Sequence, residues 1–514
     1  MRLTPGEKQL FLSASAYLSL GCICLLSLQM AWTGFVSSDD AYYVEAGLGW
    51  FEQFPYVAHH FGTVRAAIAI PIALMIYLFG ESELSVTLST ALFLVATAGL
   101  TLFMLGNLVG RVAALLTCLV LVTLPIFSLK ATIPCADLPE LFFAALSFWL
   151  FWRACWAKRR VALLLVSGIS AGFAFSAHEL TIALLLFYLV LFLRAYKIPR
   201  KTYLWMAVGF ATVIIAESIY YWITTGNPAH RFMLLLHATT VHDRTQVGFL
   251  EIAAGGTLHM WEPIDPLVML LTHHDFGILG WMSIPAVWWL VAYQWQNPSK
   301  PVSLARLALG FSLTWCIVSA VLLRDMILLP RYYMVAAYCL LIVCAVWAST
   351  QLWPQRQRLA IGMLTISLIA NLLSIAIDNK NPRFAERSLV AHLKRTQGTV
   401  ITDPLTAHNT EWYCRWEGVD CSRIIAGVPK PKATYFWNPK ATSTPNRFVP
   451  KDALADYQPT PLWEELWSQE ESPRLIVTLL RLMGLSNVLP AAILGKLSHP
   501  NPTVHLYIVP EFPE

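Results

Sequence analysis

Long apolar segments separated by short basic tracts run through most of this 514-residue chain and limit what it can fold into. Charged residues make up only 13% of the sequence, whereas roughly 25% is usual in soluble domains. A helix needs about 20 mostly apolar residues to cross a bilayer. We therefore expect an all-α polytopic membrane protein. Eleven spans are predicted, at about residues 10–35, 83–105, 112–129, 138–157, 161–177, 179–194, 203–224, 276–296, 306–323, 332–352 and 359–377.

Basic residues predict the orientation of these spans, because cytoplasmic loops are enriched in Lys and Arg. Fourteen basic residues fall in one set of loops, and six fall in the other, namely Arg65, Lys130, Arg231, Arg244, Arg324 and Arg331. This asymmetry holds only if the short apolar segment 66–80 does not cross. We expect that segment to be a juxtamembrane helix within a first external loop at 36–82, with the N-terminus in the cytoplasm.

The first apolar segment is too long to be the core of a signal peptide. It runs from Leu10 to Phe35, whereas such a core has about 7–15 residues and precedes a small-residue cleavage site. We interpret it as a retained first span.

The net charge of +5 does not indicate a nucleic-acid partner, because the basic residues cluster in loops and no RNA- or DNA-binding motif is present.

The chain changes character after about residue 377, where it becomes polar and rich in proline. We expect a transmembrane domain over 1–377 and a small extracytoplasmic α/β domain over 378–514. Segments 399–404 and 504–509 are typical of short strands, and 388–395 of a short helix. Cys414 and Cys421 are seven residues apart in this polar region, where a disulfide and two free thiols are both open.

Acidic residues follow the first span and precede a later one. Asp39 and Asp40 are adjacent where the first span ends, and Asp137 comes just before the span at 138–157. Two neighbouring carboxylates can divide labour, one as a base and the other as a hydrogen-bond or metal partner. An acid pair at the interface can also be merely solvated, and Asp137 can also be a helix N-cap.

Basic and histidine side chains are expected on the same external face. Arg331 begins a span there and can bind a phosphate bidentately, or simply extend to the headgroups. His178 and Glu179 form the tip of a short helical hairpin near bilayer depth, where ionisable groups are costly and usually functional. His59 and His60 could ligate a divalent cation, although adjacent side chains point apart.

The order of these features resembles the GT-C superfamily of polytopic glycosyltransferases. Closest in appearance are the protein O-mannosyltransferase, aminoarabinose transferase and lipopolysaccharide galacturonosyltransferase branches. The resemblance covers about residues 10–350, has His178 where a Lys is common, and leaves the C-terminal domain unmatched. The motifs that carry it are Asp39-Asp40-Ala41-Tyr42-Tyr43, Ala136-Asp137-Leu138-Pro139, the Gly-rich segment 167–175 followed by His178-Glu179, Thr225-Gly226-Asn227-Pro228, and Leu329-Pro330-Arg331-Tyr332.

This resemblance implies a glycosyltransferase that takes its sugar from a polyprenyl phosphate at the external face. Asp39 would deprotonate the acceptor hydroxyl, and Asp40 and Asp137 would orient the acceptor or a cation. The donor phosphate would be held by Arg331 and Tyr332 with Arg65 or His178. Glu179, His59 and His60 are candidate accessory or acceptor residues, and His59, His60 and Asp137 are candidate ligands of a possible divalent metal ion.

The sugar and the acceptor are not determined by these motifs, and the acceptor could be a lipid, a glycan or a protein. We expect a bacterial inner-membrane location. Two other functions remain open, a multi-span transporter and a lipid-linked oligosaccharide ligase or polymerase. Transporters commonly show related halves and spans broken near the midplane, whereas the polar residues here gather at one surface.

Overall fold

The computed structural model describes residues 5–241, 265–292, 299–322, 329–378, 381–446, 448–498 and 501–511. Arg244 and Arg324, expected in external loops, lie outside the described residues. The chain forms two compact units. The first comprises residues 1–31, 39–78 and 87–375, and the second comprises residues 32–38, 79–86 and 376–514.

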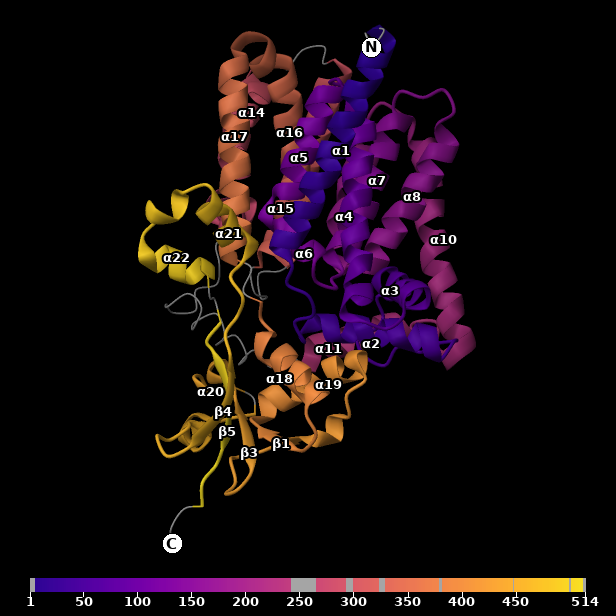
Figure 1. The fold of residues 1–514 in the computed structure, drawn as a ribbon. Coiled ribbons are helices and arrows are strands. Elements are labelled where there is room, and N and C mark those ends of the chain that lie inside the picture. The colour runs from indigo at the N-terminus through magenta and orange to yellow at the C-terminus, as the bar shows by residue number, and fades with distance from the viewer. Residues whose placement is uncertain are drawn as a thin grey trace. The chain divides into compact units, whose positions relative to one another are not determined.

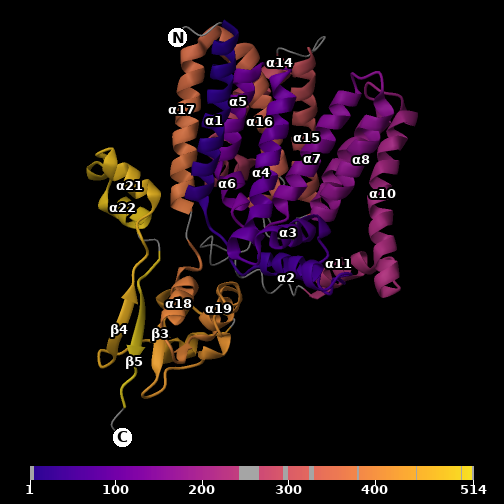
Figure 2. The ribbon, with the colours of Figure 1, turned by 45° about the vertical axis from the view of Figure 1, so that its right-hand side comes forward.

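The first unit is a bundle of apolar helices that run alongside one another (Figures 1 and 2). Each of the eleven expected apolar segments overlaps at least one of its helices. Among the described residues, five helices are long and apolar enough to cross a membrane, or six if one bent pair is a single span. The bundle helices are α1 (Pro5–Ala31), α4 (Glu83–Gly106), α5 (Arg111–Thr123), α6 (Pro125–Ala131), α7 (Asp137–Ala154), α8 (Arg160–Ala177), α9 (Ile182–Leu193), α10 (Arg200–Thr225), α13 (Asp265–Thr272), α14 (Leu279–Ala292), α15 (Lys300–Leu322), α16 (Met334–Trp347) and α17 (Trp353–Asp378).

The span expected as one helix over 112–129 is broken into α5 and α6, which meet at an angle of 62°. The cause is Pro125, the first residue of α6. A proline disfavours helical backbone in the residue before it, and Leu124 is extended at φ −68° and ψ 125°. A break at this proline was not expected from the sequence.

Close packing of α8 on α10 depends on glycine. A Cβ at Gly168 would lie 2.0 Å from the Met206 carbonyl oxygen, and one at Gly209 would lie 2.1 Å from the Leu165 carbonyl oxygen. Small residues let helix backbones approach closely inside a membrane. The Gly-rich segment therefore sets the distance between these two helices.

Three helices lie across one end of this bundle (Figures 1 and 2): α2 (Asp39–Glu52), α3 (Ala66–Phe79) and α11 (His230–Val241). The helix α3 is the expected juxtamembrane helix, whereas α2 was not anticipated. Its sequence begins with the two acidic residues Asp39 and Asp40, which a helix N-terminus favours. The acid pair therefore starts a second helix rather than trailing the first span.

The second unit contains a five-stranded sheet in the order β2-β1-β3-β5-β4. The strand β1 pairs in parallel with β2 and β3, and β5 pairs antiparallel with β3 and β4. Both expected strands are present, as β1 and β5. The strands are β1 (Val400–Thr402), β2 (Ile424–Ala426), β3 (Thr434–Trp437), β4 (Glu464–Gln469) and β5 (Val504–Ile508).

The second unit also contains α-helices, of which α18 packs against the sheet. The expected helix over 388–395 is α18, which begins four residues earlier at Phe384. Leu389 and Leu393 of α18 pack with Val400, Phe436 and Leu506 of the sheet. The helices are α18 (Phe384–Arg395), α19 (Pro404–Glu417), α20 (Pro439–Thr442), α21 (Leu475–Leu482) and α22 (Ala491–Ser498).

The second unit also takes in two short segments from the N-terminal part of the chain. Arg387 forms an ion pair with Glu83, and Arg383 Nε donates a hydrogen bond to the carbonyl oxygen of Val36 at 2.7 Å. A domain that begins at residue 378 thus leaves out part of this unit.

Of the two alternatives for its cysteines, the structure has free thiols at Cys414 and Cys421.

Candidate active site

An ion pair joins two residues of the first unit that are far apart in the sequence. Arg331 Nη2 donates to Asp39 Oδ2 at 2.8 Å, although the two residues are 292 positions apart. Asp39 is the first residue of α2, and Arg331 lies in the 3-10 turn Pro330–Tyr333 that leads into α16. The side chains are 46% and 28% exposed, respectively. Asp39 and Arg331, which we expected on the same face, therefore lie next to each other.

The other two aspartates are buried beside this pair. Asp40 and Asp137 are 3% and 5% exposed. Asp137 is the first residue of α7 and not its N-cap, which is Ala136. The hypothesis that Asp137 caps its helix is therefore wrong. Its carboxylate instead contributes to raising the pKa of Arg65.

Arg65 is a second guanidinium at this site. It lies between α2 and α3, where its Nη2 donates to Glu179 Oε2 at 3.1 Å and its Nη1 donates to the Tyr43 hydroxyl. Burial alone would lower the pKa of Arg65, but Tyr43, Glu179, Asp137 and Asp39 together raise it above the ordinary value. Its Nε is buried without a hydrogen-bond partner. A buried N–H group without an acceptor is costly for folding, and an oxygen atom of a bound anion would accept its hydrogen bond.

Glu179 is engaged by two arginines rather than free for an acceptor. One oxygen pairs with Arg65 at 3.1 Å, and the other accepts from Arg231 Nη2 at 2.9 Å. Arg231 is 2% exposed and also pairs with Glu217 at 2.9 Å. The result is an alternating chain of charges, Arg65–Glu179–Arg231–Glu217, that holds Arg65 in place. Glu179, expected as an accessory or acceptor residue, thus has an arginine partner on each of its carboxylate oxygens.

His178 lies next to Tyr332, with ring centroids 5.9 Å apart. Burial, together with the positive charge of Arg65, lowers the pKa of His178 to about 4. The imidazole is therefore neutral near pH 7 and cannot supply the positive charge of the Lys common at this position. Its Nδ1 accepts the backbone N–H of Leu180 at 3.2 Å, which leaves Nε2 as the protonated nitrogen.

Tyr332 lies beside two other candidate phosphate-binding residues, Arg331 and His178. The Arg331 guanidinium carbon is 5.5 Å from the centre of the Tyr332 ring. The backbone of this turn is held by Trp315, whose Nε1 donates to the Tyr332 carbonyl oxygen at 2.7 Å. Arg331, Tyr332 and His178 therefore form one face of the site.

The histidine pair His59-His60 does not join this constellation. His59 Nε2 pairs with Glu45 at 3.0 Å on the surface of α2. His60 stacks on Tyr42, with ring centroids 4.1 Å apart. Across the described parts of the chain, three metal-ligating atoms come together only at other residues. The expected metal group of His59, His60 and Asp137 is therefore not formed.

Sequence reasoning missed several residues of this site. Glu140, 4% exposed on α7, accepts from the Thr181 hydroxyl at 2.8 Å and lies 3.9 Å from His178 Nδ1. Tyr43 and Arg231 were likewise given no role. The available signal was an acid inside an apolar segment, because such groups are costly in a membrane and are usually functional.

The chain is similar to known proteins in both sequence and structure. Residues 67–222 match the family model described as dolichyl-phosphate-mannose-protein mannosyltransferase. No curated protein matches the chain significantly. The structure is similar to ArnT from Cupriavidus metallidurans in the apo state, with a TM-score of 0.57 at 13% identity, over 89% of this chain and 96% of that chain. The same protein bound to undecaprenyl phosphate gives 0.56 at 13% identity, over 84% and 94%.

A more distant likeness is to the oligosaccharyltransferase AglB from Archaeoglobus fulgidus in complex with an inhibitory peptide and a dolichol-phosphate. Its TM-score is 0.47 at 11% identity, over 81% of this chain and 65% of that chain. The chain shares its fold with ArnT over 89% of its residues, and the resemblance to the GT-C glycosyltransferases is confirmed at the level of the fold.

Proposed function

We propose that this protein is a membrane glycosyltransferase that moves a sugar from a polyprenyl phosphate to a hydroxyl-bearing lipid, glycan or protein on the extracytoplasmic face. The observation that carries the proposal is the convergence of Arg331 and Arg65 on the carboxylates Asp39 and Asp137 at one end of the bundle. Two guanidinium groups and a base are what transfer from a phosphate donor requires.

The arginines account for the donor phosphate. Arg331 is part exposed and makes a single contact with Asp39, so other N–H groups of its fork can bind phosphate oxygens. The unpaired Nε of Arg65 is a further donor. His178 adds a neutral N–H beside Tyr332. Similarity to the structure of ArnT bound to undecaprenyl phosphate supports a donor of this class.

Asp39 is our candidate general base. In the structure, Arg331 Nη2 occupies Asp39 Oδ2 at 2.8 Å. A donor phosphate that takes over Arg331 releases Asp39 to receive the proton of the acceptor hydroxyl. The acceptor oxygen then bonds to the anomeric carbon as the bond from that carbon to the phosphate oxygen breaks, with inversion. The electron pair goes to the leaving polyprenyl phosphate, whose charge Arg331 and Arg65 stabilise.

The topology belongs to the same proposal. With the N-terminus in the cytoplasm, as the basic residues predict, the end of the bundle that carries α2 and α3 faces outward. We place the protein in a bacterial inner membrane with eleven spans and a domain of about residues 378–514 outside. The site then opens at headgroup depth, where a polyprenyl phosphate presents its phosphate.

Turnover by the purified protein tests the proposal. Detergent-solubilised protein is mixed with a polyprenyl-phosphate sugar and extracts of envelope lipids and glycans, and free polyprenyl phosphate is measured by mass spectrometry. Release is expected with wild type and lost with Asp39→Asn. The matched control is Glu45→Gln, which removes a more distant carboxylate from the same helix. Transport needs two compartments, so release in detergent also excludes a pure transporter.

A further inference from the structure

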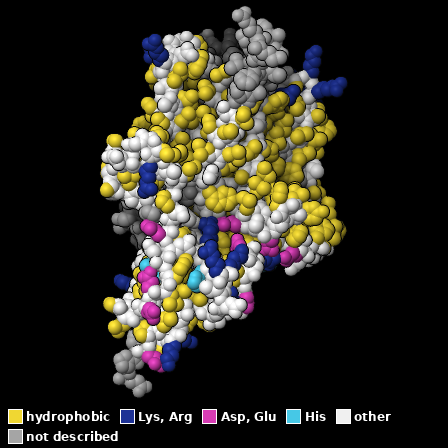
Figure 3. All heavy atoms as spheres, in the orientation of Figure 1, with side chains coloured by type: hydrophobic (Ala, Val, Ile, Leu, Met, Phe, Trp, Pro, Cys, Tyr) yellow, Lys and Arg dark blue, Asp and Glu magenta, His cyan; other side chains and the backbone are white. Residues whose placement is uncertain are grey.

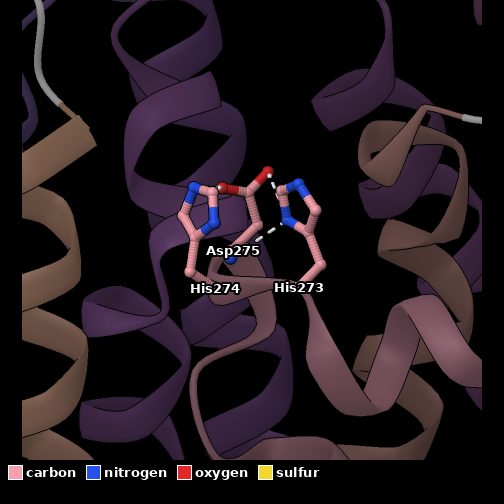
Figure 4. A group of neighbouring side chains, drawn as sticks. All are labelled: His273, His274 and Asp275. Carbon is pink, nitrogen blue, oxygen red and sulfur yellow. Dashed lines mark hydrogen bonds and ion pairs between the residues drawn. The ribbon is translucent and has the colours of Figure 1, made fainter. Parts of the chain in front are cut away.

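Two imidazoles and a carboxylate meet at the turn that joins α13 to α14. They belong to the consecutive residues His273, His274 and Asp275, whose ligand atoms all lie within 4.8 Å of one another. Figure 4 shows the Asp275 carboxylate between the two rings. None of the three takes part in the charge network around Asp39, so the proposed glycosyl transfer does not explain them.

The separations fit a first-row metal ion. In a tetrahedral zinc site the ligand atoms lie about 2.0–2.2 Å from the metal and therefore about 3.3–3.6 Å from one another. Here Asp275 Oδ2 is 3.7 Å from His273 Nδ1, and Asp275 Oδ1 is 3.6 Å from His274 Nε2. The two contacts use different carboxylate oxygens, and the imidazole planes are within 23° of parallel, so the rings must rotate to aim their in-plane nitrogens at one ion.

The turn that carries the three side chains is held from several directions. The carbonyl oxygen of His274 accepts from the Gly277 N–H at 2.9 Å and from the Ser374 hydroxyl at 3.2 Å. Phe276 is fully buried. Gly277 has a φ of +52°, and a Cβ there would lie 2.2 Å from Asn371. A rigid backbone of this kind keeps ligands close together before the ion arrives.

Capping of the turn explains only part of the cluster. His273 Nδ1 accepts the backbone N–H of Asp275 at 3.3 Å, as an N-terminal cap of the 3-10 turn would. This hydrogen bond uses the Nδ1 lone pair, so His273 would bind an ion through Nε2, or through Nδ1 once the hydrogen bond is given up. The hydrogen bond needs neither the His274 ring nor the Asp275 carboxylate. Yet the two rings stack, with centroids 4.3 Å apart, and both face that carboxylate.

We propose that His273, His274 and Asp275 form a binding site for a divalent transition-metal ion, of which Zn²⁺ is the best match. Imidazole nitrogen with one carboxylate oxygen suits zinc, whereas calcium and magnesium prefer oxygen ligands throughout. Three protein ligands leave a coordination position for water or for an oxygen of a bound molecule. The ion would fix the turn that precedes α14.

The test uses the full-length protein in detergent without a histidine tag. The protein is stripped with a chelator, reloaded with Zn²⁺ and freed of excess, and its zinc content is measured by mass spectrometry. Affinity is measured by competition with a chromogenic chelator. One ion per chain is expected for wild type, with affinity at least tenfold weaker in His274→Ala and in Asp275→Asn. The matched control is His59→Ala, from the other adjacent histidine pair, and its zinc affinity should equal that of wild type.

Thermal unfolding provides a second readout that does not depend on glycosyl transfer. Zinc should raise the unfolding temperature of wild type and of His59→Ala, and should leave that of His274→Ala unchanged. The His274 side chain is 57% exposed, so its removal should leave the metal-free protein folded. Less than a tenth of an ion per chain, or equal zinc affinity in wild type and both ligand variants, would overturn the proposal.

Discussion

Replacing the proposed base should tighten the binding of the donor phosphate while it stops turnover. Asp39 and a phosphate compete for the same guanidinium, because Arg331 Nη2 donates to Asp39 Oδ2 at 2.8 Å. Asp39→Asn removes that competitor together with a negative charge that repels the incoming phosphate. A site in which Asp39 helped to hold the donor would behave in the opposite way.

The exposure of the pair sets the size of the effect. The side chains of Asp39 and Arg331 are 46% and 28% exposed, and ion pairs open to solvent contribute about 0.2–1 kcal/mol. Freeing Arg331 should therefore lower the Kd for a polyprenyl phosphate by a factor of about 1.4–5. Arg331→Lys should raise the Kd by about tenfold, because an ammonium cannot bind phosphate in the bidentate geometry of a guanidinium.

The measurement is equilibrium binding of radiolabelled undecaprenyl phosphate, without a sugar, to the detergent-solubilised protein at fixed ionic strength. Glu45→Gln is the matched control, since it removes a carboxylate of α2 that pairs with His59 instead. Its Kd should equal that of wild type. A higher Kd in Asp39→Asn would refute the competition between Asp39 and the donor phosphate for Arg331.

Three further predictions concern stability, each measured by denaturant unfolding of the purified protein. Arg231→Leu should cost about 3–5 kcal/mol because it leaves Glu217 without its buried partner at 2.9 Å, and adding Glu217→Leu should recover part of that loss. Gly168→Leu should cost about 1–3 kcal/mol or more, since even a Cβ would lie 2.0 Å from the Met206 carbonyl oxygen; an unchanged midpoint would contradict the close packing of α8 on α10. The pKa of His178 falls from 6.5 to about 4 on folding, so the stability that this residue contributes is present above pH 6.5 and lost as the pH falls toward 4, by about 3 kcal/mol in all. His178→Gln should flatten that part of the pH profile, and a profile that kept the wild-type slope would refute the assignment.

Hydropathy and charge along the chain predicted the helical bundle and the juxtamembrane helix α3. These properties are local, because each segment must satisfy the bilayer by itself. The same reasoning anticipated strands β1 and β5 at the start and end of the second unit. It did not anticipate β2, β3 and β4, each of which pairs with strands that are distant in the sequence.

The sequence also indicated which side chains are candidates for the site. The acid pair Asp39-Asp40, the lone Asp137 and Arg331 stand out because ionisable groups are rare at the ends of apolar segments and costly there. Their order along the chain was enough to recognise the GT-C resemblance. No pattern within the sequence, however, states which of these charges touch.

Only the tertiary structure decided the partners. It paired Arg331 with Asp39 across 292 residues, placed Glu179 between Arg65 and Arg231, and gave Glu217 a partner that the sequence left open. It also left His59 on the surface and separated it from Asp137, so the expected metal group did not form. The physical reason is that a buried charge is strongly destabilising without an opposite charge beside it, and the packing of the helices decides which opposite charge is near. That packing depends on the whole bundle, whereas hydropathy depends on each segment alone.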